Sequence, residues 1–86
     1  MIVALHKDFE KSFKKLPPKI KQKAIAQLTL FKQNPWDPKL YNHFLRAEYD
    51  GYRSISITGD YRAFYRSLSA DKAVFTHIGT HAQLYS

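Results

Sequence analysis

In the first half of the chain, apolar residues recur at the spacing of an α-helix. Residues 2–5 form a short apolar run that predicts a first strand, and Asp8 follows as a candidate N-cap. The first helix ends at Pro17-Pro18, and its apolar face consists of Phe9, Phe13 and Leu16. A longer helix is predicted over 18–33, because proline suits a first helical turn. Its apolar stripe consists of Ile20, Ala24, Leu28 and Phe31.

From about residue 44 the hydrophobic period changes from a helical one to two. Alternating apolar and polar residues predict strands over 53–58, 61–68 and 73–78, with turns at Gly59-Asp60 and at 69–72. Because the links are short, these strands should form an antiparallel meander. Residues 44–49 could add a fourth strand, and the pattern leaves that open.

The order of elements predicts an α+β fold: an N-terminal strand, a two-helix hairpin, a meander of three or four strands and a short C-terminal turn or helix. The hairpin should cover one face of the sheet. Ile55 and Ile57 then point at the helices, whereas Ser54 and Ser56 point toward an open, polar face. We expect function on that open face.

Composition narrows the possibilities further. A chain of 86 residues should make one domain, residues 1–86, and its net charge of +7 comes largely from lysines in the first 39 positions. That charge fits either the solubility of the helix faces or a polyanionic or acidic partner, and it does not choose between RNA, DNA, protein and lipid. The absence of cysteine excludes disulfide scaffolds and thiolate chemistry. No apolar run is long enough for a membrane span, so we expect a cytoplasmic protein with no membrane partner.

The strongest candidate for chemistry is the C-terminal run Ile78-Gly79-Thr80-His81-Ala82-Gln83-Leu84-Tyr85, which ends a strand with a histidine and an aromatic residue. His43 precedes the meander in a predicted loop, and His77 lies on the pleat face opposite Ile78. Histidine can both take and give a proton near neutral pH. His6, at the end of the first strand, is interpreted as scaffold.

Several motifs in this order resemble the RelE/ParE superfamily of bacterial toxins from type II toxin-antitoxin modules, most closely the ribosome-dependent messenger-RNA endonucleases of the YafQ and RelE type. The motifs are Phe-x-x-x-Phe-x-Lys-Leu-Pro from Phe9 to Pro17, Asn34-Pro35, His43 before Gly51-Tyr52-Arg53, the segment 58–66 and the segment 78–85. The resemblance covers the chain from Ile2 to Tyr85.

The resemblance implies a set of site residues. His43 and His81 match catalytic histidines, and Asp60 matches an acidic residue at the strand turn. Arg62 matches a phosphate-binding arginine, and Tyr85 matches a terminal aromatic residue. Arg53 and Ser56 are further candidates for binding the substrate. Two positions depart from close relatives, since Ser56 and His77 stand where those relatives carry basic residues.

The implied reaction needs no metal or cofactor, because the RNA's own 2′-hydroxyl attacks the adjacent phosphate while a base and an acid transfer protons. His43 and His81 can transfer them, and Arg62 with His77 can hold the phosphate. Asp60 can orient a histidine or simply favour the turn, and Arg62 could instead pair with Glu48 or Asp50.

The implied partners are the ribosome, messenger RNA and a small acidic antitoxin. The resemblance also implies that the chain is a monomer when free and forms a hetero-oligomer with the antitoxin. Two alternatives stay open: a ParE-like toxin that acts on gyrase or another protein without nuclease activity, and a decayed toxin that only binds its antitoxin.

Overall fold

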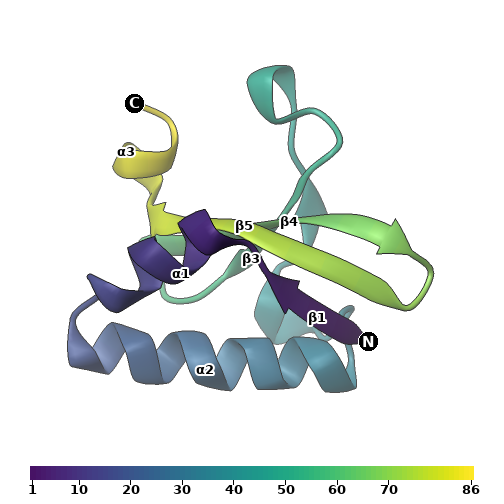
Figure 1. Cartoon of the computed structure of the whole chain (residues 1–86), viewed down its shortest axis with the longest axis horizontal. Helices are drawn as coiled ribbons and strands as arrows, with labels where there is room; N and C mark the ends of the chain where they lie inside the picture. Colours follow the sequence, from purple (N-terminus) through teal and green to yellow (C-terminus); the bar gives the residue numbers. More distant parts are fainter.

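One five-stranded sheet organises the computed structural model, which describes residues 1–86 (Figure 1). The spatial order is β1 (Ile2–Leu5), β5 (Lys72–Thr80), β4 (Tyr61–Ser69), β3 (Arg53–Ser56) and β2 (His43–Phe44). β1 runs parallel to β5, and all other neighbours are antiparallel. The predicted α+β fold and meander are therefore confirmed.

Two helices follow β1 and cover one face of the sheet. α1 (Lys7–Lys14) packs on β5, and α2 (Pro18–Gln33) runs beneath the sheet with the bounds that the sequence predicted (Figure 1). The N-cap of α1 is His6, whose Nδ1 accepts the Asp8 backbone N–H at 3.1 Å. The prediction of Asp8 as the cap was wrong, because the helix begins one residue before it.

The main core lies between the helices and the sheet. Phe31 of α2 is fully buried, and its ring meets Tyr65 and Phe75 edge-on, with centroids 4.8 and 5.1 Å away. Phe9 of α1 packs on Phe75 in the same core, with ring centroids 5.9 Å apart. Such edge-to-face pairs add to the energy of apolar burial, so aromatic packing holds the helices on the sheet.

The sequence had suggested that the opposite face is open. This was wrong, because a second apolar cluster covers part of that face. Leu45, Phe64 and Leu84 are buried there, and Tyr49 and Tyr52 pack against them. These residues come from β4, from the loop after β2 and from α3 (His81–Leu84), which rise on that side of the sheet (Figure 1). The cluster fixes the loop and the C-terminus relative to the strands between them.

The segment 44–49 is mostly not a strand. β2 contains only two residues, and His43 is one of them rather than part of a loop. The 3₁₀ helix η2 (Ala47–Tyr49) follows, with Ala47 at φ 56°, a left-handed conformation that no strand accommodates. An earlier 3₁₀ helix, η1 (Pro38–Leu40), links α2 to β2.

Among the helices of this chain, none combines the length and the apolar character needed to cross a bilayer.

Replacing Phe31 by alanine should lower the free energy of unfolding by about 3–5 kcal/mol, because it leaves a cavity beside the rings of Tyr65 and Phe75. Urea denaturation measures this. Ile25→Ala on the same helix is the matched control, since Ile25 is 56% exposed and its loss should cost far less. Equal costs for the two substitutions would contradict the assignment of this core.

Candidate functional site

A row of side chains crosses the face of the sheet that lies opposite the helices. Strand pairing aligns His43 with Ser54, Ser54 with Phe64 and Phe64 with His77. Side chains of directly paired residues point to the same face. Because Phe64 belongs to the second apolar cluster, this row faces away from α2.

A β-bulge in β5 brings two polar side chains to this face together. The pairing shifts between Phe64 and Tyr65, so that Phe64 pairs with His77 and Tyr65 with Phe75. Thr76 is the extra residue, and its Oγ1 lies 2.7 Å from Nδ1 of His77. Bulges re-aim side chains in this way, and here the bulge keeps Phe75 in the core and His77 on the other face.

His77 and His81 are linked by aromatic rings. The Tyr49 ring lies 5.5 Å from the His77 ring and 5.7 Å from the Tyr85 ring, and Tyr85 lies 4.6 Å from His81. The Tyr49 hydroxyl donates to the Leu84 carbonyl at 2.6 Å, which ties α3 to the loop after β2. The two C-terminal histidines therefore belong to one packed surface.

Local capping positions His81. Thr80 and Gln83 form a capping box, in which Thr80 Oγ1 accepts from the Gln83 N–H at 3.1 Å and Gln83 Oε1 accepts from the Thr80 N–H at 2.8 Å. The His81 N–H also donates to the Asp60 carbonyl at 3.1 Å. The backbone of Asp60 thus lies beside His81, while its side chain is exposed.

Arg62 lies in the next row of the same face, paired with Ser56 on one side and Gly79 on the other. Its Nη1 donates to the Thr58 carbonyl at 2.6 Å and the Tyr61 carbonyl at 3.0 Å, and Ser56 Oγ donates to the same Thr58 carbonyl at 2.9 Å. No ion pair joins Arg62 to Glu48 or Asp50. Both bonds use Nη1, which leaves Nε and Nη2 for an external oxygen.

Arg53 does not join this face. It pairs with Phe44 and Tyr65, so it shares their side of the sheet. Its guanidinium stacks on Phe44 at 4.0 Å and Trp36 at 4.8 Å. Its Nε donates to Asn42 Oδ1 at 2.7 Å. Arg53 therefore stabilises the loop that leads into β2.

His43 lies on the same face of the sheet as His77, but it makes none of the aromatic contacts that join His77 to His81. Its Nδ1 lies 2.8 Å from the Tyr41 carbonyl, so Nδ1 carries the proton and Nε2 is the free acceptor. Three inter-strand spacings of about 4.8 Å separate it from His77, or roughly 14 Å. The structure thus brings His77, His81, Tyr85 and Arg62 to one region and leaves His43 at its far edge.

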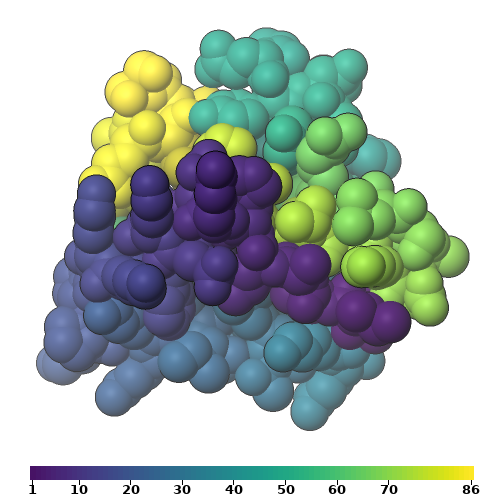
Figure 2. Space-filling view, in the orientation of Figure 1, coloured from purple at the N-terminus to yellow at the C-terminus, as the bar shows by residue number.

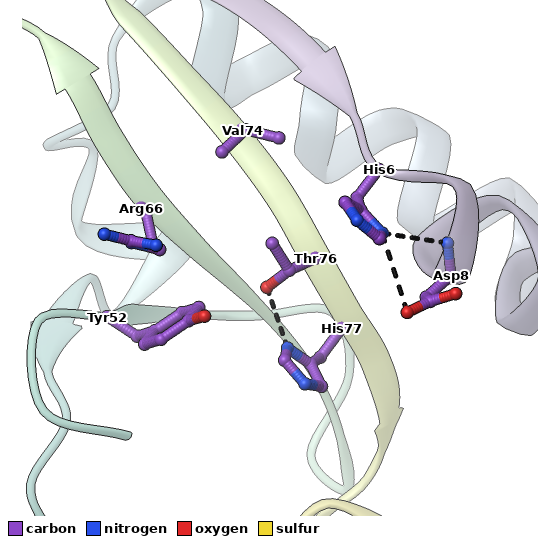
Figure 3. Close-up of a pocket in the computed structure, with 7 residues that line it drawn as sticks. All are labelled: His6, Asp8, Tyr52, Arg66, Val74, Thr76 and His77. Carbon is purple, nitrogen blue, oxygen red and sulfur yellow. Dashed lines mark hydrogen bonds and ion pairs between the residues drawn. The ribbon is translucent and has the colours of Figure 1, made fainter. Parts of the chain in front are cut away.

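A pocket of about 320 Å³ opens beside His77, between β5 and the start of α1 (Figure 3). Its lining residues are His6, Asp8, Tyr52, Arg66, Val74, Thr76 and His77. In Figure 2 the N-terminal segment (purple) lies directly below the C-terminal segment (yellow) and the loop after β2 (teal). Burial lowers the pKa of His77 below its ordinary value of 6.5. The charge of Asp8 opposes this with a smaller raising effect, and His6 adds a smaller lowering effect.

Sequence reasoning did not place His6, Tyr52 or Arg66 in this pocket. His6 was interpreted as scaffold, and Tyr52 and Arg66 stood only inside family motifs, with no site role assigned. Arg66 could have been found, because it follows Phe64 by two positions in a strand. No alternation rule places His6 there, since the position depends on the parallel pairing of β1 with β5. Nowhere do three His, Asp or Glu side chains gather closely enough to hold a metal ion.

Comparisons with known proteins agree with this fold. The family described as the ParE toxin of type II toxin-antitoxin systems, parDE, matches residues 3–85. A crystal structure of YafQ from E. coli strain BL21(DE3) is 25% identical, with a TM-score of 0.82 over 98% of this chain and 97% of that one. No curated protein matches the chain.

Two further structures extend the likeness. A YoeB/ParE toxin from Agrobacterium tumefaciens is 19% identical, with a TM-score of 0.76 over 94% of this chain and 99% of that one. The E. coli DinJ-YafQ toxin-antitoxin complex contains a chain that is 24% identical, with a TM-score of 0.78 over 98% of this chain and 96% of that one. Both support the fold.

The fold and the matched family define a small toxin of a type II toxin-antitoxin system. The chain belongs to the ParE toxin family, within the RelE/ParE superfamily, and is similar to YafQ.

A methyl group at position 79 should disturb α3. The Cβ of Gly79→Ala would lie 2.8 Å from Gln83 Oε1, so Gln83 must give up its bond to the Thr80 N–H. We expect a loss of about 1 kcal/mol in the free energy of unfolding, the usual cost of a helix cap. In a Gln83→Ala background the same methyl should cost far less, and urea denaturation of the four proteins measures this coupling. Additive losses would contradict the mechanism.

The free energy of unfolding should fall as the pH drops from 6.5 through the lower folded-state pKa of His77. In that window the unfolded chain binds more protons than the folded one, so acid favours unfolding. Chemical denaturation of wild type and His77→Gln at several pH values measures the effect, and the variant should lack this component. At pH 8 His77 is neutral in both states, which provides the reference. An NMR titration with the His77 pKa at or above 6.5 would contradict the burial argument.

Proposed function

We propose that this chain is a ribosome-dependent messenger-RNA endonuclease that inhibits translation, cleaving by metal-independent attack of the 2′-hydroxyl. The observation that supports this most is the single surface that joins His77, Tyr85 and His81 beside Arg62. Such a surface combines proton-transferring imidazoles, a guanidinium for the phosphate and an aromatic ring for a base.

Each member has a chemical task in this proposal. Arg62 holds the phosphate through the nitrogens that its turn leaves free, and Ser56 helps to fix that turn. Tyr85 is 41% exposed and stacks on a base, while Asp60 holds His81 through its backbone carbonyl. His43 and His81 are the proton-transferring pair that the family resemblance implies. Arg53 acts as a positioning residue for the loop that leads into β2, where His43 lies.

The proposed partners follow from charge. The net charge of +7 and the lysines of α1 and α2 suit ribosomal RNA and a small acidic antitoxin. Similar toxins have been crystallised with antitoxins, as in the DinJ-YafQ complex of E. coli and RelBE2 of Mycobacterium tuberculosis. We propose a cytoplasmic protein that is monomeric when free and forms a hetero-oligomer with its antitoxin.

A ParE-like activity on gyrase or another protein is the second candidate, and the name of the matched family favours it. The two candidates differ in what they damage. A nuclease leaves cut messages, whereas a gyrase poison leaves broken DNA and intact messages.

Purified protein added to a translation extract should produce discrete cuts in messenger RNA, mapped by primer extension. His81→Ala should reduce the cleavage rate by about 10²–10⁴-fold, the usual contribution of a positioned acid or base. Gln22→Ala, on the exposed face of α2, is the control and should cut like the wild type.

Intact messages at doses that arrest growth would overturn the nuclease proposal, and accompanying DNA damage would favour the ParE-like activity. Antitoxin binding without toxicity on expression would indicate a decayed toxin.

A further inference from the structure

Three exposed aromatic residues gather in β2 and in the segment that joins it to α2. Trp36 is 62% exposed, Tyr41 74% and Phe44 71%. The leucines of the same stretch, Leu40 and Leu45, are buried, so the large apolar side chains left to solvent here are all aromatic. The exposed aliphatic side chains lie elsewhere, on β1, α2 and β4. A local concentration of exposed rings indicates a binding surface, whereas single exposed apolar residues are ordinary.

A guanidinium joins two of these rings. The Cζ atom of Arg53 lies 4.0 Å from the centroid of the Phe44 ring and 4.8 Å from that of the Trp36 ring. Arg53 has no carboxylate within ion-pair distance, so its charge is not neutralised inside the chain. The two rings are held against one cation, and their large exposed fractions leave ring surface open to a further planar group.

Asn42 anchors this arrangement to the main core. Its Oδ1 accepts from Arg53 Nε at 2.7 Å, and its Nδ2 donates to the Pro35 carbonyl at 2.9 Å and to the Tyr65 hydroxyl at 2.8 Å. Tyr65 is buried in the main core. One side chain thus ties the guanidinium, and the residue before Trp36, to a buried ring. The surface is therefore preformed, which lowers the entropic cost of binding.

Tyr41 is displayed at a conformational cost. Its φ of 49° lies in the left-handed region, where glycine or asparagine is the ordinary choice at the end of a helix. Because the ring is exposed, its own burial does not offset this cost. A strained and exposed aromatic residue indicates a contact outside the chain.

The charges nearby favour a polyanion as the partner. The segment 34–46 contains one carboxylate, Asp37, and its Oδ1 already accepts the Lys39 N–H at 2.9 Å as the cap of η1. Lys39, Arg46 and Arg53 supply the opposite charge. Exposed rings interleaved with cations are how proteins bind unpaired nucleotides, because the rings stack on bases while the cations neutralise phosphates. A protein groove would present aliphatic side chains as well, and here these are buried.

We propose that Trp36, Phe44 and Arg53 form a stacking platform for the unpaired bases of single-stranded RNA. Tyr41 supplies a further exposed ring three positions before Phe44. The platform contains none of the proton-transferring or phosphate-binding groups of the proposed function, so it is a second RNA contact. β2 is an edge strand in which His43 faces the candidate site and Phe44 the platform. An RNA strand that crosses the histidine-bearing face can therefore continue round this edge.

Trp36 is the only tryptophan of the chain, so its fluorescence reports directly on the platform. The probe is a short single-stranded RNA with 2′-O-methyl groups, which cannot undergo 2′-hydroxyl attack, so binding is measured without cleavage. At fixed salt this probe should quench the fluorescence to saturation. A blunt RNA duplex, whose bases are already paired and stacked, should leave the fluorescence nearly unchanged.

Phe44→Leu removes the ring, keeps an apolar side chain and should weaken binding by about 5-fold or more, the lower end of what stacking on one base contributes. Phe44→Tyr keeps the ring and should bind like the wild type. Because Phe44 is exposed, both replacements leave the core intact. Ile2→Ala is the matched control, since Ile2 is 59% exposed on β1 at the opposite edge of the sheet, and it should also bind like the wild type.

No binding, binding without quenching, or equal affinity of Phe44→Leu and wild type would overturn the platform, since the lysines alone would then hold any bound RNA. A dimer that quenches Trp36 in the absence of RNA would overturn it in favour of a second copy of this chain. These outcomes leave the nuclease proposal intact, because the probe cannot be cut. A wild type that binds the probe through Phe44 but cuts no message would sink the nuclease proposal and keep the platform.

Discussion

The bulge in β5 at Thr76 and His77 is the constraint on which the rest of this structure depends. Without it, strict alternation would place Phe75 and His77 on the same face. With it, Phe75 packs against Phe31 and Phe9 beneath the sheet, and His77 turns to the other side with Thr76. The main core and the histidine surface therefore share one strand without competing for one face.

The two faces have different physical tasks. Beneath the sheet, rings close-pack and supply most of the apolar burial. Above it, the smaller cluster around Phe64 fixes the loop after β2 and α3 at the edges of a polar region. The cationic groups of that region have few acidic partners, since the one close pair of opposite charge is His6 with Asp8. Unpaired positive charge on a rigid surface is suited to an anionic ligand.

The candidate site followed from sequence only where local rules sufficed. The family motifs indicated His81, Tyr85, Arg62 and His77, and the structure brings these to one region. Arg53 lies on the other side of the sheet. The family motif did not indicate this, because it gives no information on which face of the sheet a strand residue takes. His6 was interpreted as scaffold, since its environment comes from a parallel pairing of residues about 70 positions apart.

The sequence by itself determined the elements, namely the helix over residues 18–33, the antiparallel meander and the short C-terminal helix, because periodicity and prolines act over a few residues. Tertiary structure alone decided what meets on the second face. The bulge, the left-handed turn at Ala47 and the pairing of β1 with β5 set those contacts, and each depends on packing between segments far apart in the chain.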